Sequence, residues 1–97
     1  MVVTATEIPD PYSLGISCRI LRGGEEIFSG STNSGLIGRT FEELNEYLYR
    51  DNPIPLGTVV STGTGIMVPN ELCLRDGDTV EILIEGIGRL SNPVRKL

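Results

Sequence analysis

Two stretches of alternating residues, each turned back by glycines, constrain the fold of this chain more than any other feature. The first, residues 14–22 (LGISCRILR), is followed by Gly23–Gly24, which can adopt the positive φ angles of a two-residue hairpin turn. The segment EEIFSGS, residues 25–31, then predicts a return strand. On the first strand one face carries Ile16, Cys18 and Ile20, and the other carries Ser17, Arg19 and Leu21.

The second stretch, residues 79–94 (TVEILIEGIGRLSNPV), predicts another hairpin. Gly86 and Gly88 form its corner, and Pro93 marks a strand end or edge, because proline cannot donate to a sheet. The outgoing strand places Val80, Ile82 and Ile84 on one face and Glu81 and Glu85 on the other. Two isolated hairpins are marginal in water, so their apolar faces need a common sheet or a partner.

Between the hairpins lies one helix signal. Thr40 precedes Glu43 by the spacing of a capping box, and Asn52–Pro53 stops the pattern, so we predict a helix at about residues 40–51. Its apolar side consists of Phe41, Leu44 and Leu48. The predicted fold class is mainly β with one helix (α+β), with antiparallel hairpins at both ends and residues 1–97 forming a single domain.

The connecting segments carry weaker patterns. TNSGLIG, residues 32–38, is typical of a loop. An apolar run at residues 58–62 predicts a short strand, whereas residues 66–78 have no clean period and predict a partly buried connection.

The residue types that are missing exclude several kinds of chemistry. The absence of histidine removes Ser–His and Cys–His nucleophile pairs and any histidine-ligated metal. The one lysine, Lys96, lies at the end of the sequence, and a net charge of −5 argues against nucleic acid and membrane partners. Without a signal peptide or an apolar run long enough to cross a bilayer, we predict a cytoplasmic protein with reduced thiols. The apolar settings of Cys18 and Cys73 predict buried packing residues.

A glycine–threonine turn is the first candidate for chemistry. In STGTG, residues 61–65, Gly63 and Gly65 let the backbone approach a ligand and expose its N–H groups, and Thr64 offers a hydroxyl between them. Such a turn suits a carboxylate or phosphate oxygen. Glycine-rich turns are common, however, so from the pattern alone a bulge or a tight corner is the preferred interpretation.

The charged candidates have simpler interpretations. Asp76–Gly77–Asp78 predicts a turn, because the remaining oxygen ligands of a calcium loop are absent. The adjacent glutamate pairs point in different directions and are not placed to hold one cation. Arg19 and Arg22 are interpreted as solvated strand residues, and the alternative is that one of them meets an anionic substrate or the carboxylates of a second subunit.

The order RDNPIP, VVSTGTGI, L-R-D-G-D-T-V-E and G-I-G-R-L-S-N-P-V resembles the carboxy-terminal part of the fumarylacetoacetate hydrolase family. The similarity begins near VVTATEIPDPYSL and covers nearly the whole chain. Within the family, GGEEIFSGSTNSGL is most similar to the sugar-acid dehydratase branch, which includes 2-keto-3-deoxy-D-arabinonate dehydratase-like members.

The resemblance implies a mixed β roll, of which this chain would form the carboxy-terminal part. It also implies a parent enzyme that holds Mg²⁺ or Ca²⁺ on three carboxylates and binds a 2-oxo acid through its carboxylate and keto oxygens. The family's T-G-T turn lines that pocket, which assigns substrate contact to Thr64 and close approach to Gly63 and Gly65.

This chain departs from the family pattern at the metal site. The family's Glu-x-Glu pair, later aspartate and catalytic lysine precede the matched stretch, and this chain has no Glu-x-Glu. We therefore expect a fragment of a divalent-metal-dependent lyase or hydrolase with no catalytic residue, metal ligand or cofactor of its own, inactive alone and partnered by an amino-terminal half or a second subunit in a homo-oligomer. The alternative is a non-catalytic β module that dimerises or docks onto a missing amino-terminal half.

Overall fold

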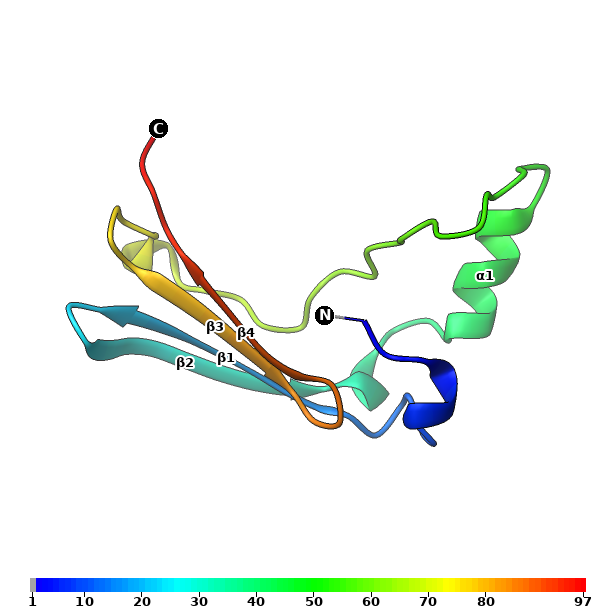
Figure 1. Ribbon diagram of the computed structural model, residues 1–97, viewed down its shortest axis with the longest axis horizontal. Helices are drawn as coiled ribbons and strands as arrows, with labels where there is room; N and C mark the ends of the chain where they lie inside the picture. The colour runs from blue at the N-terminus through cyan, green and yellow to red at the C-terminus, as the bar shows by residue number, and fades with distance from the viewer. Residues whose placement is uncertain (1) are drawn as a thin grey trace.

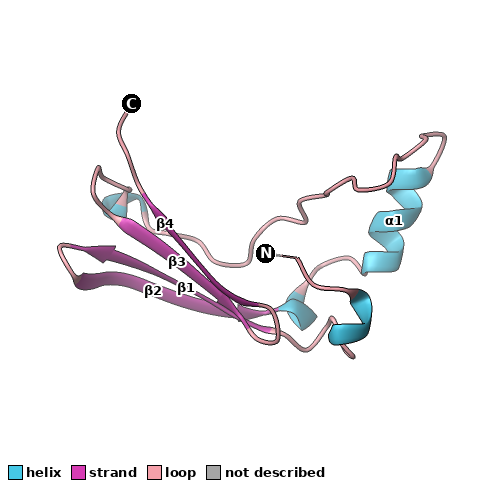
Figure 2. Ribbon diagram, in the orientation of Figure 1, coloured by secondary structure: helices cyan, strands magenta, loops and turns pink. Residues whose placement is uncertain are grey.

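Both predicted hairpins form, and they join in one sheet. In the computed structural model, which describes residues 2–97, β1 (Gly15–Arg22) pairs with β2 (Glu25–Asn33), and β3 (Thr79–Ile84) pairs with β4 (Gly88–Pro93). β1 also pairs with β3, which gives the antiparallel order β2-β1-β3-β4 (Figures 1 and 2). Gly23 and Gly24 turn the first hairpin with φ angles of +59° and +83°, as expected for a two-residue turn.

Cross-strand pairs build an apolar face on this sheet. Ile20 lies opposite Val80 on β3 and Phe28 on β2, and Ile16 lies opposite Ile84. Ile20, at 1% exposure, is the one fully buried apolar residue among residues 2–97. The apolar face is thus organised as predicted, but the core that it forms is very small.

The chain exposes much more surface than its mass requires. Its accessible surface is 7658 Å², whereas a compact protein of this mass exposes roughly 5,400 Å². Its radius of gyration is 15.9 Å, against roughly 12.5 Å for a compact domain of this length. Leu56 is 105% and Val59 90% exposed. The chain therefore exposes roughly 2,200 Å² more surface than a compact protein of its mass.

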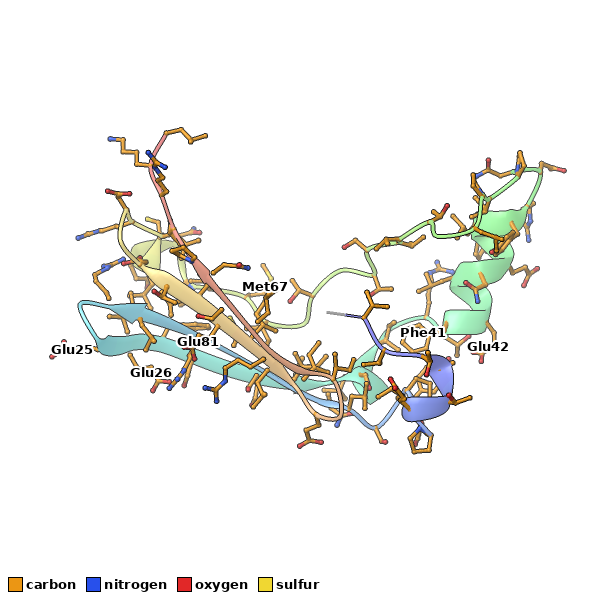
Figure 3. All side chains as sticks on the ribbon, viewed as in Figure 1. Glu25, Glu26, Phe41, Glu42, Met67 and Glu81 are labelled. Atoms are coloured by element: carbon orange, nitrogen blue, oxygen red, sulfur yellow. The ribbon has the colours of Figure 1, made fainter. Side chains whose placement is uncertain are left out.

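The helix α1 (Phe41–Tyr49) stands apart from the sheet (Figure 1). It begins where predicted, with the Thr40 hydroxyl accepting from the Glu43 amide at 3.1 Å. Tyr12 connects it to the residues before β1: its ring stacks on Phe41 with centroids 4.9 Å apart, and its hydroxyl donates to Glu42 at 2.6 Å. Figure 3 shows Phe41 and Glu42 at the start of the helix. The helix ends two residues earlier than predicted, since Asp51 adopts a φ of +53°.

The strand predicted at residues 58–62 does not form. Residues 50–69 contain no helix or strand and cross between α1 and the sheet as a single unpaired segment (Figure 1). The run makes no ladder hydrogen bonds, because it does not lie along either of the two free edges of the sheet, β2 and β4. The connection that follows contains one short 3₁₀ turn, Asn70–Leu72, and is partly buried as predicted, since Ile66 and Leu72 are half-buried and Asp78 is buried among otherwise exposed residues.

The arginines predicted as solvated are paired instead. Arg19 Nε donates to Glu81 at 2.6 Å, and Arg22 donates to both carboxylate oxygens of Asp78 at 2.8 Å. Asp78 is 1% exposed and also accepts from the Arg75 amide at 2.8 Å. These hydrogen bonds, led by that from Arg22, lower the pKa of Asp78 to about 2. Asp78 is thus the last residue of the predicted turn, and its buried carboxylate also fixes the Arg22 side chain and the Arg75 amide.

Two smaller expectations concern the cysteines and the membrane. Cys73 is exposed and Cys18 is half-buried, so the prediction of two buried packing residues was wrong; both are free thiols. No helix within residues 2–97 has the length and apolar character needed to cross a bilayer.

Candidate functional site

The glycine–threonine turn is seated on β2 by two close backbone approaches. A Cβ at Gly65 would lie 3.0 Å from Thr32 Oγ1, and a Cβ at Gly30 would lie 2.9 Å from Ile66 Cγ2. A Cβ at Gly30 would force Ile66 to shift, and one at Gly65 would force Thr32 to give by a few tenths of an ångström, so both glycines permit a close approach. The Ile66 side chain thus rests against the bare backbone of Gly30, and this contact fixes the turn over the sheet.

Gly63 and Thr64 shape the turn itself. Gly63 has a φ of +93° with open space around it, so glycine is needed there for its backbone angle. The Thr64 hydroxyl accepts from the Ile66 amide at 3.1 Å, a local turn of the kind that serine and threonine stabilise. The hydroxyl is therefore held in a defined position while the residue stays exposed.

A hollow of about 480 Å³ lies beside this turn, on the apolar side of the sheet. Its volume is within the range of small-molecule sites. Its apolar lining comes from β1, β3, the start of α1 and the loops between them: Leu14, Ile16, Ile37, Phe41, Ile84 and Ile87. Gly63, Thr64 and Gly65 line the same hollow. The structure thus brings the three predicted substrate-contacting residues together, while their contact with a substrate stays a prediction.

Sequence reasoning missed the residues that support the turn. Thr32 and Gly30 lie on β2, about thirty positions before the turn, and nothing in the local pattern links them to it. A glycine inside a strand does indicate close approach of another backbone or a ligand, and Gly30 carried that signal.

The described residues do not provide a set of side chains that could bind a divalent cation. Residues 2–97 contain no group of three or more His, Cys, Asp or Glu side chains that could hold a metal ion. Glu85 accepts from the Gly15 amide at 3.2 Å, and Asp78 is committed to Arg22. We therefore assign no metal-dependent step to these residues.

Comparison with known proteins identifies related sequences along the whole chain. A family model described as fumarylacetoacetate (FAA) hydrolase C-terminal matches residues 1–95. A 2-dehydro-3-deoxy-D-arabinonate dehydratase of Saccharolobus solfataricus is 48% identical over 96 residues, which are 99% of this chain and 32% of that protein. A probable 2-keto-3-deoxyxylonate dehydratase of Haloferax volcanii is 42% identical over 93 residues, 96% of this chain and 32% of that protein.

Solved structures agree with the sequence matches. A 2-keto-3-deoxy-D-arabinonate dehydratase complexed with magnesium and 2,5-dioxopentanoate superposes with a TM-score of 0.94 at 48% identity, covering 98% of this chain and 34% of that one. This chain therefore spans about a third of the length of the relatives that it matches.

Proposed function

This chain belongs to the fumarylacetoacetate hydrolase family, of which it corresponds to the carboxy-terminal part, and from that premise we propose that it forms one wall of the substrate pocket of a sugar-acid dehydratase. The substrate class is 2-oxo acids of the 2-keto-3-deoxy sugar type, and Mg²⁺ is the cofactor of the complete enzyme. Support comes from two relatives described as dehydratases of such acids and from a structural relative solved with magnesium and 2,5-dioxopentanoate.

The single observation that carries the proposal is the seating of the turn beside the apolar hollow. Thr64 presents a hydroxyl between two glycines, and Gly63 and Gly65 leave the backbone bare where an oxygen-rich ligand would approach. We assign the Thr64 hydroxyl and neighbouring amides to the oxo-acid end of the substrate. The apolar lining excludes water and strengthens those hydrogen bonds.

The ligands for the cation are assigned to polypeptide outside residues 2–97. When Mg²⁺ is bound, it polarises the keto oxygen and makes the adjacent carbon more acidic. The described residues contain no carboxylate cluster for it, and the surface surplus of roughly 2,200 Å² is large enough for an extensive interface with such polypeptide. On this proposal the 97 residues act as one part of a composite catalytic domain and are inactive alone.

Complementation tests this proposal. The chain is mixed with the amino-terminal two thirds of the Saccharolobus relative, and Mg²⁺-dependent dehydration of 2-keto-3-deoxyarabinonate is followed. We expect no turnover from either part alone and measurable turnover from the mixture. Thr64→Val should lower the activity of the mixture about tenfold, the order of magnitude for losing one positioned hydrogen bond. The matched control is Thr58→Val, on the same exposed segment but outside the hollow. Full turnover by the chain alone, or equal activity of the two variants, would refute the assignment.

The second candidate function is a non-catalytic β module that dimerises or docks onto a separate amino-terminal half. The exposed apolar side chains and the open edges of β2 and β4 favour it, because bare sheet edges are pairing surfaces. A catalytically silent mixture in which the two parts nonetheless form a stable complex would select this function.

A further inference from the structure

A hydroxyl stands in an apolar row of the sheet, close to the glycine–threonine turn. Thr32 on β2 lies opposite Ile16 on β1, and Ile16 lies opposite Ile84 on β3, so the three side chains share one face. All three line the hollow of about 480 Å³. The Thr32 hydroxyl is therefore the polar group that this cross-strand row contributes to the hollow.

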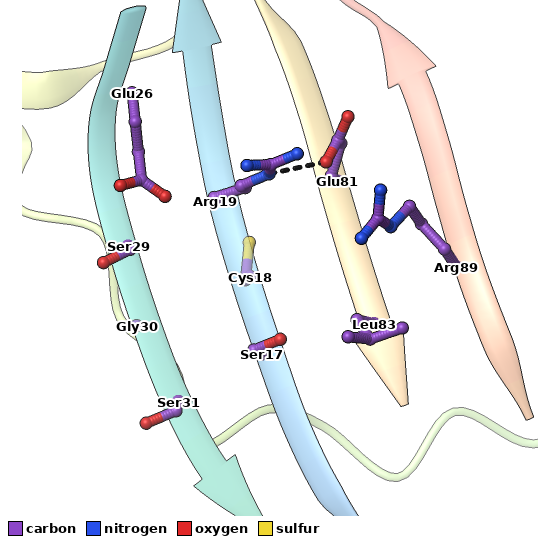
Figure 4. Close-up of a pocket in the computed structure, with 10 residues that line it drawn as sticks. All are labelled: Ser17, Cys18, Arg19, Glu26, Ser29, Gly30, Ser31, Glu81, Leu83 and Arg89. Atoms are coloured by element: carbon purple, nitrogen blue, oxygen red, sulfur yellow. Dashed lines mark hydrogen bonds and ion pairs between the residues drawn. The ribbon is translucent and has the colours of Figure 1, made fainter. Parts of the chain in front are cut away.

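The other hydroxyls of β2 have a different setting. Ser29 and Ser31 lie on the opposite face of the sheet, beside the ion pair that Arg19 forms with Glu81 at 2.6 Å (Figure 4). A strand hydroxyl among polar neighbours needs no ligand to explain it. Thr32 is the next residue along the strand and points to the other face, among apolar side chains. A hydroxyl in such surroundings costs free energy unless it is hydrogen-bonded.

The polar side chains that follow Thr32 are committed to the backbone of the chain itself. Asn33 Oδ1 accepts from the Gly35 amide at 2.8 Å, and Ser34 Oγ accepts from the Leu14 amide at 2.9 Å. The Thr32 hydroxyl forms no hydrogen bond with another of the described residues, and Thr32 is half-buried and held in the β1–β2 ladder. It is thus a fixed hydrogen-bonding group whose capacity to donate and accept is unused.

This hydroxyl belongs to the same site as the turn. A Cβ at Gly65 would lie 3.0 Å from Thr32 Oγ1, so the hydroxyl lies against the bare backbone of that glycine. Gly65 follows Thr64 directly, with Cα atoms ~3.8 Å apart, so one small acid can reach both hydroxyls. The exposed amides and the Thr64 hydroxyl suit the charged oxo-acid end of such a ligand. A single neutral hydroxyl beside isoleucines suits an uncharged oxygen farther along its carbon chain.

We propose, resting on the proposed function, that Thr32 is a further substrate-binding residue, whose hydroxyl binds the terminal oxygen of a 2-keto-3-deoxy sugar acid while Thr64 holds the oxo-acid end. Dehydration of the five-carbon acid removes the hydroxyl next to the chain end as water and keeps the terminal oxygen in 2,5-dioxopentanoate. A threonine hydroxyl is too weak an acid to protonate a leaving hydroxyl, so it suits the oxygen that stays. It can accept from the terminal hydroxyl of the substrate and donate to the terminal carbonyl of the product. Thr32 thereby selects acids that carry an oxygen at the far end.

A pair of ligands that differ at the chain end tests this assignment. The chain is combined with Mg²⁺ and the amino-terminal two thirds of the Saccharolobus relative, and the dissociation constants of 2,5-dioxopentanoate and 2-oxopentanoate are measured by calorimetry. The two acids share the oxo-acid end and the chain length, but 2-oxopentanoate ends in a methyl group. Thr32→Val keeps the shape of the side chain and removes its hydroxyl. It should raise the dissociation constant of 2,5-dioxopentanoate roughly three- to tenfold and leave that of 2-oxopentanoate unchanged.

Further variants separate recognition of the terminal oxygen from displacement of the turn. Thr32→Ser keeps a hydroxyl and should retain the unaltered preference for 2,5-dioxopentanoate. Thr64→Val should weaken the binding of both acids, because they share the oxo-acid end. Thr79→Val is the matched control, since Thr79 is also a half-buried strand threonine but lies outside the hollow, and it should change neither dissociation constant.

The outcomes distinguish this assignment from the proposed function. An unaltered complex that binds neither acid would refute the proposed function and the role of Thr32 together. A complex that binds both acids, with Thr32→Val weakening both equally or weakening neither, would overturn the role of Thr32 alone. Loss of the preference for 2,5-dioxopentanoate in Thr32→Val, with the preference kept in Thr32→Ser, supports it.

Discussion

Adding one methyl group at Gly30 should displace the glycine–threonine turn. The new Cβ would lie 2.9 Å from Ile66 Cγ2 and 3.2 Å from Phe28 Cζ. Carbon atoms pack at roughly 3.5–4.0 Å, so Ile66 must retreat by roughly 0.6–1.1 Å. The segment that carries Ile66 lies outside any helix or strand, so we expect it to move rather than to unfold the sheet.

Gly30→Ala should therefore lower the free energy of unfolding only modestly, and its structural effect should be confined to the turn. Overpacking a rigid core costs roughly 1–3 kcal/mol, and a movable segment brings Gly30→Ala to the low end, about 1 kcal/mol. The assay is the two-dimensional ¹⁵N–¹H spectrum of the chain, in which the Thr64 and Gly65 amides should shift while the β1–β3 amides do not. Gly38→Ala is the matched control, because that glycine has open space and no positive φ.

A compensating substitution separates displacement from general destabilisation. Ile66→Ala removes the Cγ2 methyl that Gly30→Ala would strike, so the double variant should return the Thr64 amide toward its original position. An unchanged Thr64 resonance in a folded Gly30→Ala chain would refute the idea that Gly30 seats the turn, and so would a double variant as displaced as the single one.

Two further predictions concern the buried carboxylate of Asp78 and the hydroxyl of Tyr12, each of which holds a neighbouring segment in place. The pKa of Asp78 is lowered to about 2 from an ordinary value of 3.8, so the stability that it contributes is present above pH 3.8 and is lost as the pH falls toward 2. In thermal melts, the difference in melting temperature between the unaltered chain and Asp78→Asn should shrink across that pH window. A melting-temperature difference that does not change with pH would contradict the buried pair. Tyr12→Phe removes the hydroxyl that accepts from the Phe41 amide at 2.8 Å and donates to Glu42. Hydrogen exchange of the Phe41 amide should therefore be severalfold faster in this variant than in a Tyr49→Phe control. Equal exchange rates in the two variants would show that Tyr12 does not hold α1.

The elements that depend on local chemistry were predictable from the sequence. The Gly23–Gly24 turn and the Thr40 cap each act over a few residues, and both hairpins and the start of α1 were predicted correctly. The apolar alternation also indicated which face of the sheet would form the core, and Ile20 is buried there.

The remaining features depend on residues that are distant in the sequence. Arg22 and Asp78 are separated by 56 positions, and only the pairing of β1 with β3 brings them together. The run at residues 58–62 has the composition of a strand, but a strand also needs a neighbouring strand to pair with, and this run pairs with neither edge of the sheet. Among the candidate site residues, Thr64 and its glycines were singled out from the sequence and their contact with a substrate stays a prediction, whereas the seat formed by Gly30 and Thr32 required the three-dimensional contact.

Calorimetric titration of the isolated chain with Mg²⁺, in the presence of a 2-oxo acid such as 2,5-dioxopentanoate, tests most directly whether the carboxylates of the metal site lie in other polypeptide. We expect no saturable heat at stoichiometric concentrations from the chain alone, and one cation bound per complex once the amino-terminal two thirds of the relative is added. Tight one-to-one binding of Mg²⁺ by the 97 residues alone would contradict the proposed composite site.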